Sequence, residues 1–293
     1  MKKVLFIVNP VAGKKKILNA LEEVDKAFYD GGCQCDIYFT KKRGDATEKV
    51  VSSAENYDIV VCGGGDGTYN ELITGVRQKG IDIPVGYIPA GSTNDFATTL
   101  GISNVPKKAA ENIVSGTPNT LDIGKFGDSY FSYVASFGAF TAASYSTSQK
   151  TKNRLGHMAY ILGGAKDLGS IKPYTAKIEA DGKVYEGDFL FGAVSNSTSI
   201  AGMIKLDKTL VDLSDGLFEI VLIRMPKHIT QVPGIFLSLK KGNYSNKYIE
   251  FFHASSIKVE TEKPLEWALD GEHATSCGEI LVENIPGAIN LIL

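Results

Sequence analysis

The 293-residue sequence lacks any apolar run long enough to cross a membrane. No segment has the 18 uninterrupted apolar residues that indicate a transmembrane helix, so we expect any membrane contact to be peripheral. Residues 1–8 are basic and then apolar, as at the start of a signal peptide. Asn9 and Pro10 end this run, and no small-residue cleavage site follows. We therefore predict that this segment forms a first strand.

The sequence is also poor in cysteine and has no excess of charge of either sign. Its four cysteines, Cys33, Cys35, Cys62 and Cys277, lack paired CxxC spacing, which favours free thiols over zinc ligands or disulfides. The 31 basic side chains are balanced by 33 acidic ones, giving a formal net charge of -2. This balance does not indicate a partner among nucleic acids. We expect a protein of the reducing cytoplasm.

The first 120 residues alternate strand and helix signals. Strands are predicted at residues 4–8, 35–39, 59–62 and 85–88, and helices at 14–30, 45–54, 70–77 and 94–100. Asp45 and Glu48 have the spacing of a capping box for the second of these helices. Short apolar strands separated by helices imply a doubly wound parallel sheet, with ligands at the carboxyl ends of its strands.

Beyond about residue 122 the pattern becomes that of a mainly antiparallel, β-sandwich-like domain. Strands are predicted at residues 130–137, 176–180, 183–195 and 217–223, and helices at 154–168 and 226–239. Asp181-Gly182 predicts a hairpin turn. The sequence therefore predicts an α/β domain over residues 1–123 and a β domain over residues 124–283, with residues 284–293 a candidate to return to the first domain.

The run Gly63-Gly64-Gly65-Asp66-Gly67-Thr68 follows the third predicted strand. Residues without Cβ let the backbone approach a ligand closely, and the N–H groups of such a turn can face phosphate oxygens. Glycines also serve tight strand-to-helix turns for steric reasons alone. Because a purely structural turn requires no carboxylate, Asp66 favours a phosphate-binding corner. Residues 9–13 and 89–95 follow two other predicted strands at the same edge.

Four motifs occur in order along the chain: Asn-Pro-Val-Ala-Gly at 9–13, the GGGDGT run, Gly-Ser-Thr-Asn-Asp at 91–95 and Asp-Gly-Glu at 270–272. This set resembles the diacylglycerol kinase catalytic-domain family of soluble bacterial lipid kinases over essentially the whole chain. The GGDGT motif by itself is shared with NAD kinases and, more loosely, with phosphofructokinases. The resemblance therefore implies that residues 1–123 form a nucleotide-binding α/β domain like that of NAD kinases and phosphofructokinases. Phosphoryl transfer needs a phosphate cradle, a divalent metal and a base, and each has a candidate here.

The resemblance implies a role for each candidate residue. Glu272 would accept the proton of the lipid hydroxyl, and Asp66 and Asp122 would complete the catalytic set. Local alternatives are capping or turn formation for the aspartates, Asn9 and Thr40, and a solvated side chain after an Asp-Gly turn for Glu272. The residues implied for the ATP site are Asn9, Thr40, Gly64, Gly65, Asp66, Gly67, Thr68, Asn70, Thr93 and Asp95.

The resemblance also implies a second magnesium ion and a lipid-facing surface. The Asp215 carboxylate, with backbone oxygens of Asp212 and Leu217, would hold the ion, since this hard cation prefers oxygen ligands. Lys15 and Lys166 would attract anionic lipid headgroups, although either could belong to a solvated face. A homodimer is implied by family similarity alone.

The sequence therefore predicts an ATP- and Mg²⁺-dependent kinase that docks on the inner membrane face and phosphorylates a lipid hydroxyl, with diacylglycerol as the leading acceptor. An NAD kinase-like enzyme with a soluble substrate is one alternative. A nucleotide- or lipid-binding protein without catalysis is the other.

Overall fold

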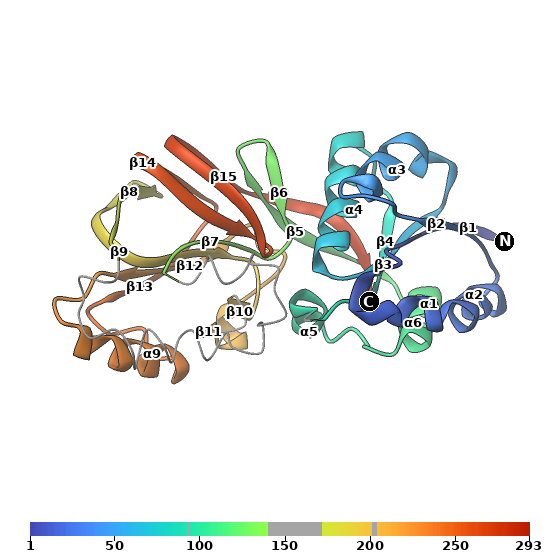
Figure 1. Ribbon diagram of the computed structural model, residues 1–293, viewed down its shortest axis with the longest axis horizontal. Coiled ribbons are helices and arrows are strands. Elements are labelled where there is room, and N and C mark those ends of the chain that lie inside the picture. Colours follow the sequence, from blue (N-terminus) through green and yellow to red (C-terminus); the bar gives the residue numbers. More distant parts are fainter. Residues whose placement is uncertain (93, 140–171, 201–203) are drawn as a thin grey trace. The chain divides into compact units, whose positions relative to one another are not determined.

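The computed structural model describes residues 1–92, 94–139, 172–200 and 204–293 (Figure 1). The chain forms two compact units, one of Met1–Ile123 with Pro286–Leu293 and one of Gly124–Ile285. Thr93, Lys166 and the helix predicted at residues 154–168 lie outside the described residues. Within the part that is described, no helix is both long and apolar enough to cross a bilayer.

The first unit is built on a parallel sheet. Its strands are β1 (Lys2–Val8), β2 (Cys33–Phe39), β3 (Ile59–Gly64) and β4 (Pro84–Pro89), in the order β2-β1-β3-β4. The end of β15 (Glu272–Ile292) pairs with β4, also in parallel. Strands β1, β3 and β4 are short and largely buried because helices cover both faces of the sheet, whereas β2, at the edge, is only partly buried.

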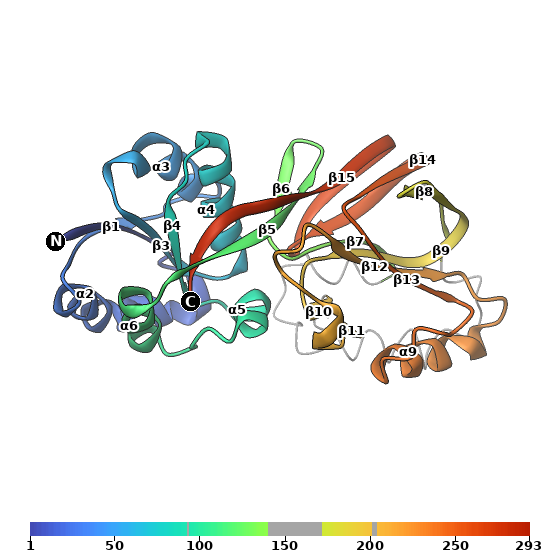
Figure 2. The ribbon, with the colours of Figure 1, turned by 180° about the vertical axis from the view of Figure 1, so that it is seen from behind.

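Figures 1 and 2 show α3 and α4 on one side of this sheet and α1, α2 and α6 on the other. The helices of this unit are η1 (Ala12–Lys15), α1 (Lys16–Asn19), α2 (Leu21–Asp30), α3 (Asp45–Ser53), η2 (Ala54–Asn56), α4 (Asp66–Lys79), α5 (Asp95–Leu100) and α6 (Pro106–Ser115). The single helix predicted at residues 14–30 is thus three short ones. Lys15, whose φ is 67°, breaks the helix between η1 and α1.

The capping box predicted at Asp45 and Glu48 is wrong. Gly44, with a φ of 82°, is the N-cap residue of α3 and makes no side-chain cap. Instead the Glu71 carboxylate, from α4, accepts hydrogen bonds from the backbone N–H groups of Gly44 (2.8 Å) and Ala46 (3.2 Å). The Asp45 carboxylate accepts from the N–H of Lys41 at 2.6 Å. A neighbouring helix therefore supplies the cap, which local spacing could not reveal.

Glu71→Ala is expected to destabilise the protein by about 1–3 kcal/mol, because two N–H groups of α3 lose a charged acceptor. Glu48→Ala removes only an exposed ion pair with Lys42 and is expected to cost under about 1 kcal/mol. Urea denaturation of both variants measures the difference. Equal losses would show that Glu71 is not the cap.

The second unit is antiparallel throughout its described pairings. Its main strands are β7 (Val134–Gly138), β8 (Tyr174–Ala180), β9 (Lys183–Ser195), β12 (Phe218–Arg224), β13 (Ile249–Ala254), β14 (Ser256–Leu269) and β15. They pair in the order β13-β12-β9-β7-β14-β15, with β8 pairing β9 and β14. The turn predicted at Asp181-Gly182 is confirmed, since both residues have positive φ and Ala180 pairs with Lys183. The remaining elements are β5 (Pro118–Phe126), β6 (Ser129–Phe131), β10 (Ser199–Ile200), β11 (Ile204–Lys205), η5 (Lys208–Leu210), η6 (Ile229–Gln231) and α9 (Val232–Lys240).

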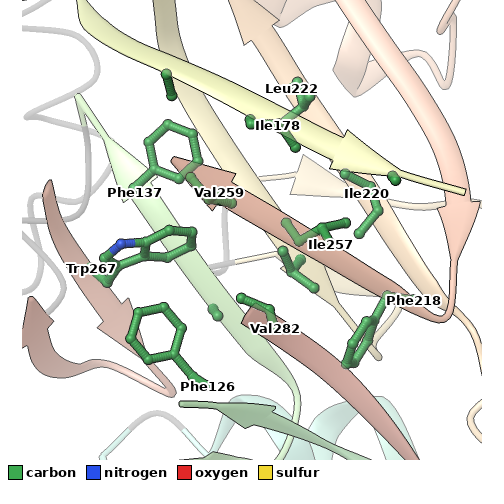
Figure 3. Packing of buried hydrophobic residues seen from close by; sticks show 14 of the residues in the cluster. Phe126, Phe137, Ile178, Phe218, Ile220, Leu222, Ile257, Val259, Trp267 and Val282 are labelled. Carbon is green, nitrogen blue, oxygen red and sulfur yellow. The ribbon is translucent and has the colours of Figure 1, made fainter. Parts of the chain in front are cut away.

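Trp267 lies at the centre of the core of the second unit (Figure 3). Its ring is fully buried between Phe126 and Phe137, with ring centroids 5.0 and 4.9 Å away in edge-to-face geometry. Its indole N–H donates to the Ser276 hydroxyl at 2.9 Å, which satisfies the one polar atom of the side chain. This packing fixes β14 immediately before the Asp-Gly-Glu turn.

Candidate active site

Three loops of the first unit meet at the carboxyl ends of its strands. Helix α4 begins at Asp66, four residues earlier than predicted, so Asp66, Gly67 and Thr68 form its first turn. The Ala90 and Gly91 N–H groups donate to the Gly64 carbonyl at 2.7 and 3.1 Å. The loops after β1, β3 and β4 are therefore bonded to one another around the start of α4.

Close backbone packing explains the glycines of these loops. A Cβ on Gly64 would lie 2.5 Å from the Thr68 hydroxyl, and one on Gly91 would lie 2.6 Å from the Cα of Gly65. Gly13 has a φ of +49°, and a Cβ there would lie 1.9 Å from the Ala90 carbonyl oxygen. The steric interpretation of the glycines is thus correct at these positions. It does not exclude phosphate binding, because the same backbone also lacks side chains that would block a ligand.

Asn9 ties the loop after β1 to the start of α4. Its amide Nδ2 donates to the Thr68 hydroxyl at 3.1 Å, and its Oδ1 accepts from the N–H of Val11 at 3.1 Å. Thr40, half-buried after β2, donates its N–H to the Val8 carbonyl at 2.9 Å. Both residues therefore have a structural role at the strand ends, as the local alternative proposed, and both lie beside the predicted phosphate corner.

Asp66 is held by two donors from outside its own helix. The Tyr87 hydroxyl donates to its Oδ1 at 3.3 Å and the Asp95 N–H to its Oδ2 at 3.1 Å. Tyr87 is buried in β4, and its ring stacks on Tyr69 with centroids 4.8 Å apart. No sequence signal pointed to Tyr87, because it lies 21 residues from Asp66 inside an ordinary apolar strand.

The remaining nucleotide-site candidates also lie near the start of a helix. Asn70 is half-buried in the second turn of α4. Asp95 opens α5, directly after Asn94, whose φ is 52° and whose Oδ1 accepts from the Gly91 N–H at 2.9 Å. Asn70 and Asp95 thus lie in the first two turns of helices that follow β3 and β4, at the carboxyl ends of these strands.

Asp122 lies where the chain leaves the first unit, beside the segment by which it returns. Its side chain is only 1% exposed, and its Oδ1 accepts from the Gly287 N–H at 2.8 Å. Gly287 has a φ of +59°, so Asp122 fixes a bend in β15. This contact gives Asp122 a structural role in the first unit.

The Asp-Gly-Glu motif is a two-residue hairpin turn between β14 and β15. Asp270 and Gly271 both have positive φ, and Leu269 pairs with Glu272. The buried Asp270 carboxylate accepts from the N–H groups of Ser132, Tyr133 and Val134 at 2.5, 3.0 and 3.0 Å. Asp270 therefore anchors the turn, and Glu272 emerges exposed as the first residue of β15.

The candidate metal loop lies in the second unit, before β12. Asp212 Oδ1 accepts from the N–H and hydroxyl of Ser214 at 3.0 Å each, and Asp215 Oδ1 accepts from the Leu217 N–H at 2.9 Å. The Leu217 carbonyl accepts from Asn284 Nδ2 at 3.1 Å, which leaves it a second lone pair. No set of three or more His, Cys, Asp or Glu side chains suited to a metal occurs among the described residues. The candidate ligands are therefore the exposed Asp215 carboxylate and the backbone carbonyls of Asp212 and Leu217.

Glu219, which the sequence analysis did not single out, lies beneath this loop. It is fully buried, and burial raises the pKa of its carboxyl to about 8, with smaller contributions from Asp215 and Asp212. Its own amide and that of Ser197 favour the ionised form slightly, but neither carboxyl oxygen accepts a hydrogen bond of normal geometry. Buried oxygens without donors beside two aspartates fit a hard cation such as Mg²⁺.

Comparison with known proteins defines the class. Residues 3–126 match the family described as "Diacylglycerol kinase catalytic domain", and residues 134–293 match "YegS C-terminal NAD kinase beta sandwich-like domain". The predicted two-domain architecture is thereby confirmed. The family match and the relatives define a phosphotransferase with an alcohol acceptor, which implies a nucleotide as phosphoryl donor.

The relatives identify the family. The chain is 31% identical over 275 residues to a diacylglycerol kinase of Bacillus subtilis (strain 168), covering 93% of this chain and 90% of that protein. It is 31% identical over 274 residues to a diacylglycerol kinase of Staphylococcus aureus (strain bovine RF122 / ET3-1), covering 93% and 86%. The chain belongs to the diacylglycerol kinase catalytic-domain family.

Solved structures agree with this assignment. The crystal structure of a diacylglycerol kinase from Bacillus anthracis str. Sterne matches with a TM-score of 0.75 at 25% identity, covering 99% of this chain and 96% of that one.

Proposed function

We propose that the protein transfers the γ-phosphoryl group of ATP to the hydroxyl of diacylglycerol and so produces phosphatidic acid. The observation that carries this proposal is the corner at the start of α4, where three glycine-containing loops meet and Asp66 is fixed by Tyr87 and the Asp95 N–H. The relatives in Bacillus subtilis and Staphylococcus aureus are diacylglycerol kinases, which supports the acceptor.

The start of α4 supports binding of the triphosphate. The N–H groups in the first turn of a helix have no partner within the helix and carry partial positive charge, which favours phosphate oxygens. Gly64, Gly65 and Gly67 leave this backbone open to a ligand. We assign the nucleotide to this corner, with Asn9, Thr40, Thr68, Asn70 and Asp95 around it and Thr93 as a further candidate.

Glu272 is proposed as the general base. It is exposed at the first position of β15, on a turn that the Asp270 carboxylate holds by three backbone hydrogen bonds. A carboxylate on a fixed turn can accept the proton of the attacking hydroxyl with little conformational cost. Such a base acts chiefly by orientation, because proton transfer is late in a loose phosphoryl-transfer transition state.

Magnesium is proposed at two places. Bound Mg²⁺ would neutralise negative charge on the phosphates, with Asp66 as its nearest candidate carboxylate at the corner. The Asp215 carboxylate, with the backbone oxygens of Asp212 and Leu217, would hold a second ion in the loop before β12, where the buried Glu219 oxygens fit a cation. We propose a structural role for this second ion.

A membrane lipid as acceptor requires contact with a bilayer. Lys15 is exposed, and its backbone φ of 67° projects it from the break between η1 and α1. We propose that Lys15 contacts anionic headgroups at the inner membrane face, as roughly 1 kcal/mol of attraction per lysine would allow. Lys166 remains a candidate for the same role.

Transfer of label from γ-labelled ATP into mixed micelles of diacylglycerol tests the proposal directly. Labelled phosphatidic acid is the expected product, with NAD as the competing acceptor in a parallel reaction. Phosphorylation of NAD in place of the lipid would favour the NAD kinase-like alternative. ATP binding with no transfer to diacylglycerol or to any lipid of a total extract would favour a non-catalytic protein.

Tyr87→Phe is expected to lower kcat/KM about 10-fold, because Asp66 loses one hydrogen bond to a charged acceptor. The ring keeps its stack on Tyr69, so thermal stability should change little. Tyr57→Phe is the matched control, since Tyr57 donates to Asp36 at 3.1 Å on the exposed surface of the same unit. If both variants retain full activity, Tyr87 does not position Asp66.

A further inference from the structure

The second unit carries a basic surface around α9. Residues 225–249 contain Lys227, Lys240, Lys241 and Lys247 and no Asp or Glu, in a chain whose acidic and basic residues are otherwise nearly balanced. All four lysines are exposed, and none forms an ion pair within the described residues. This stretch therefore departs from the mixed-charge surface typical of the protein.

Helix α9 presents an apolar side chain among these lysines. Val232, Ile235, Phe236 and Leu239 pack inward, whereas Leu237 is 52% exposed. Pro233 and Gly234 are exposed one turn before it. Figures 1 and 2 show α9 along an outer edge of its unit. Because the apolar face of α9 packs against the protein, the helix offers a membrane surface Leu237 and the flanking lysines.

Contacts between α9 and the segments on either side of it keep the four lysines close to the helix. On the amino-terminal side, the His228 N–H donates to Gln231 Oε1 at 3.0 Å. Asn246 Nδ2 donates to the Ser238 hydroxyl at 3.1 Å, and the Asn243 N–H donates to the Ser238 carbonyl at 2.9 Å. The Tyr248 hydroxyl donates to Gln231 Oε1 at 3.0 Å, and the Lys247 ammonium lies over the Tyr248 ring. Lys240 and Lys241 end the helix, and Lys247 lies along its flank.

Nearby acids do not neutralise this surface. Glu250 is paired with Arg224 at 2.9 Å. The Oδ1 of Asp207 already accepts two hydrogen bonds, from the N–H and the hydroxyl of Thr209. The four lysines thus leave a net positive field, which complements an anionic surface.

We propose that the surface formed by Leu237, Lys227, Lys240, Lys241 and Lys247 docks on an anionic lipid bilayer, with Leu237 entering the headgroup region. The inference rests on the proposed function for the membrane location of the acceptor, but the docking itself needs neither ATP nor catalysis. Each lysine near an anionic surface contributes about 1 kcal/mol, equivalent to roughly a fivefold gain in binding.

Co-sedimentation with vesicles, in the absence of ATP, tests the docking. The protein is expected to bind phosphatidylcholine vesicles that contain phosphatidylglycerol and not pure phosphatidylcholine vesicles, with binding lost at high salt. Lys240→Gln with Lys241→Gln is expected to weaken binding about 25-fold. Lys107→Gln with Lys108→Gln, an exposed lysine pair on α6, is the charge-matched control and should bind as the wild type does.

The leucine is tested in the same way. Leu237→Ser is expected to weaken vesicle binding several-fold, whereas Leu281→Ser, at a 43% exposed leucine on β15, should not. Unchanged melting temperatures show that the variants are folded. Equal binding of all variants, or no preference for anionic vesicles, would overturn the proposal, and binding only to another protein would do the same.

The kinase assay separates the two proposals. Vesicle binding without lipid phosphorylation would retain the docking surface and remove the proposed function. Phosphorylation of a short-chain, monomeric diacylglycerol by the Lys240→Gln, Lys241→Gln protein should equal that of the wild type, because these lysines take no part in the chemistry.

Discussion

Replacing Asp66 with asparagine is expected to lower kcat at least about 100-fold, as loss of a group that organises transferring phosphates typically does. The substitution removes the charge but keeps the shape. Asparagine can still accept from the Asp95 N–H, and the Tyr87 hydroxyl can turn to accept from the new amide. The expected result is therefore a folded protein with little activity.

The comparison needs a matched control for Asp66→Asn. Asp58→Asn is suitable, because Asp58 also accepts a backbone hydrogen bond, from the Lys3 N–H at 2.7 Å. Asp58 is exposed and precedes β3, at the opposite end of that strand from the glycine-rich turn. Steady-state assays with ATP and diacylglycerol give kcat, and a thermal melt checks the fold. Wild-type turnover in Asp66→Asn would mean that the corner does not organise the reacting phosphates.

Glu272→Gln has the second large expected effect, a loss of at least about 100-fold in kcat with KM for ATP nearly unchanged. Glutamine retains the size of the side chain but cannot accept the proton. The hairpin should persist, since Asp270 and Gly271 supply its positive φ values and Asp270 its anchoring bonds. Turnover by lipid-labelling assay and nucleotide binding by calorimetry separate catalysis from binding.

Glu279→Gln, on the same strand, is the control for Glu272→Gln. Glu279 is exposed and pairs with Lys258 at 3.1 Å, so its loss changes a surface charge alone. Activity close to that of the wild type is expected. A fully active Glu272→Gln protein would instead make the solvated-turn interpretation of this residue correct.

Strands β1, β3 and β4 could be predicted because their apolar runs are short and largely buried. The strand predicted at residues 59–62 is β3 (Ile59–Gly64), and the strand predicted at 85–88 is β4 (Pro84–Pro89). Helix ends were less predictable. The start of α4 at Asp66 depends on Gly65 as its N-cap, and glycine is a weak signal for that position.

Contacts between distant segments could not be predicted. The strand predicted at residues 130–137 is two strands, because the N–H groups of Ser132 and Tyr133 are turned to the Asp270 carboxylate, 137 or more residues away. The cap of α3 by Glu71 and the contact of Tyr87 with Asp66 have the same character. The order of the motifs indicated the candidate site residues, but not the distant side chains that fix their positions.

The last residues of β15 have a consequence for synthesis of the protein. Leu291 pairs with Val85 on β4, and both side chains are fully buried. On the ribosome, the amino-terminal sheet must therefore wait for the synthesis of residues 290–291, about 200 residues after β4, to gain this strand, with the β4 edge exposed meanwhile. A fragment that stops after Ile123 would keep this edge open permanently and would be prone to self-association.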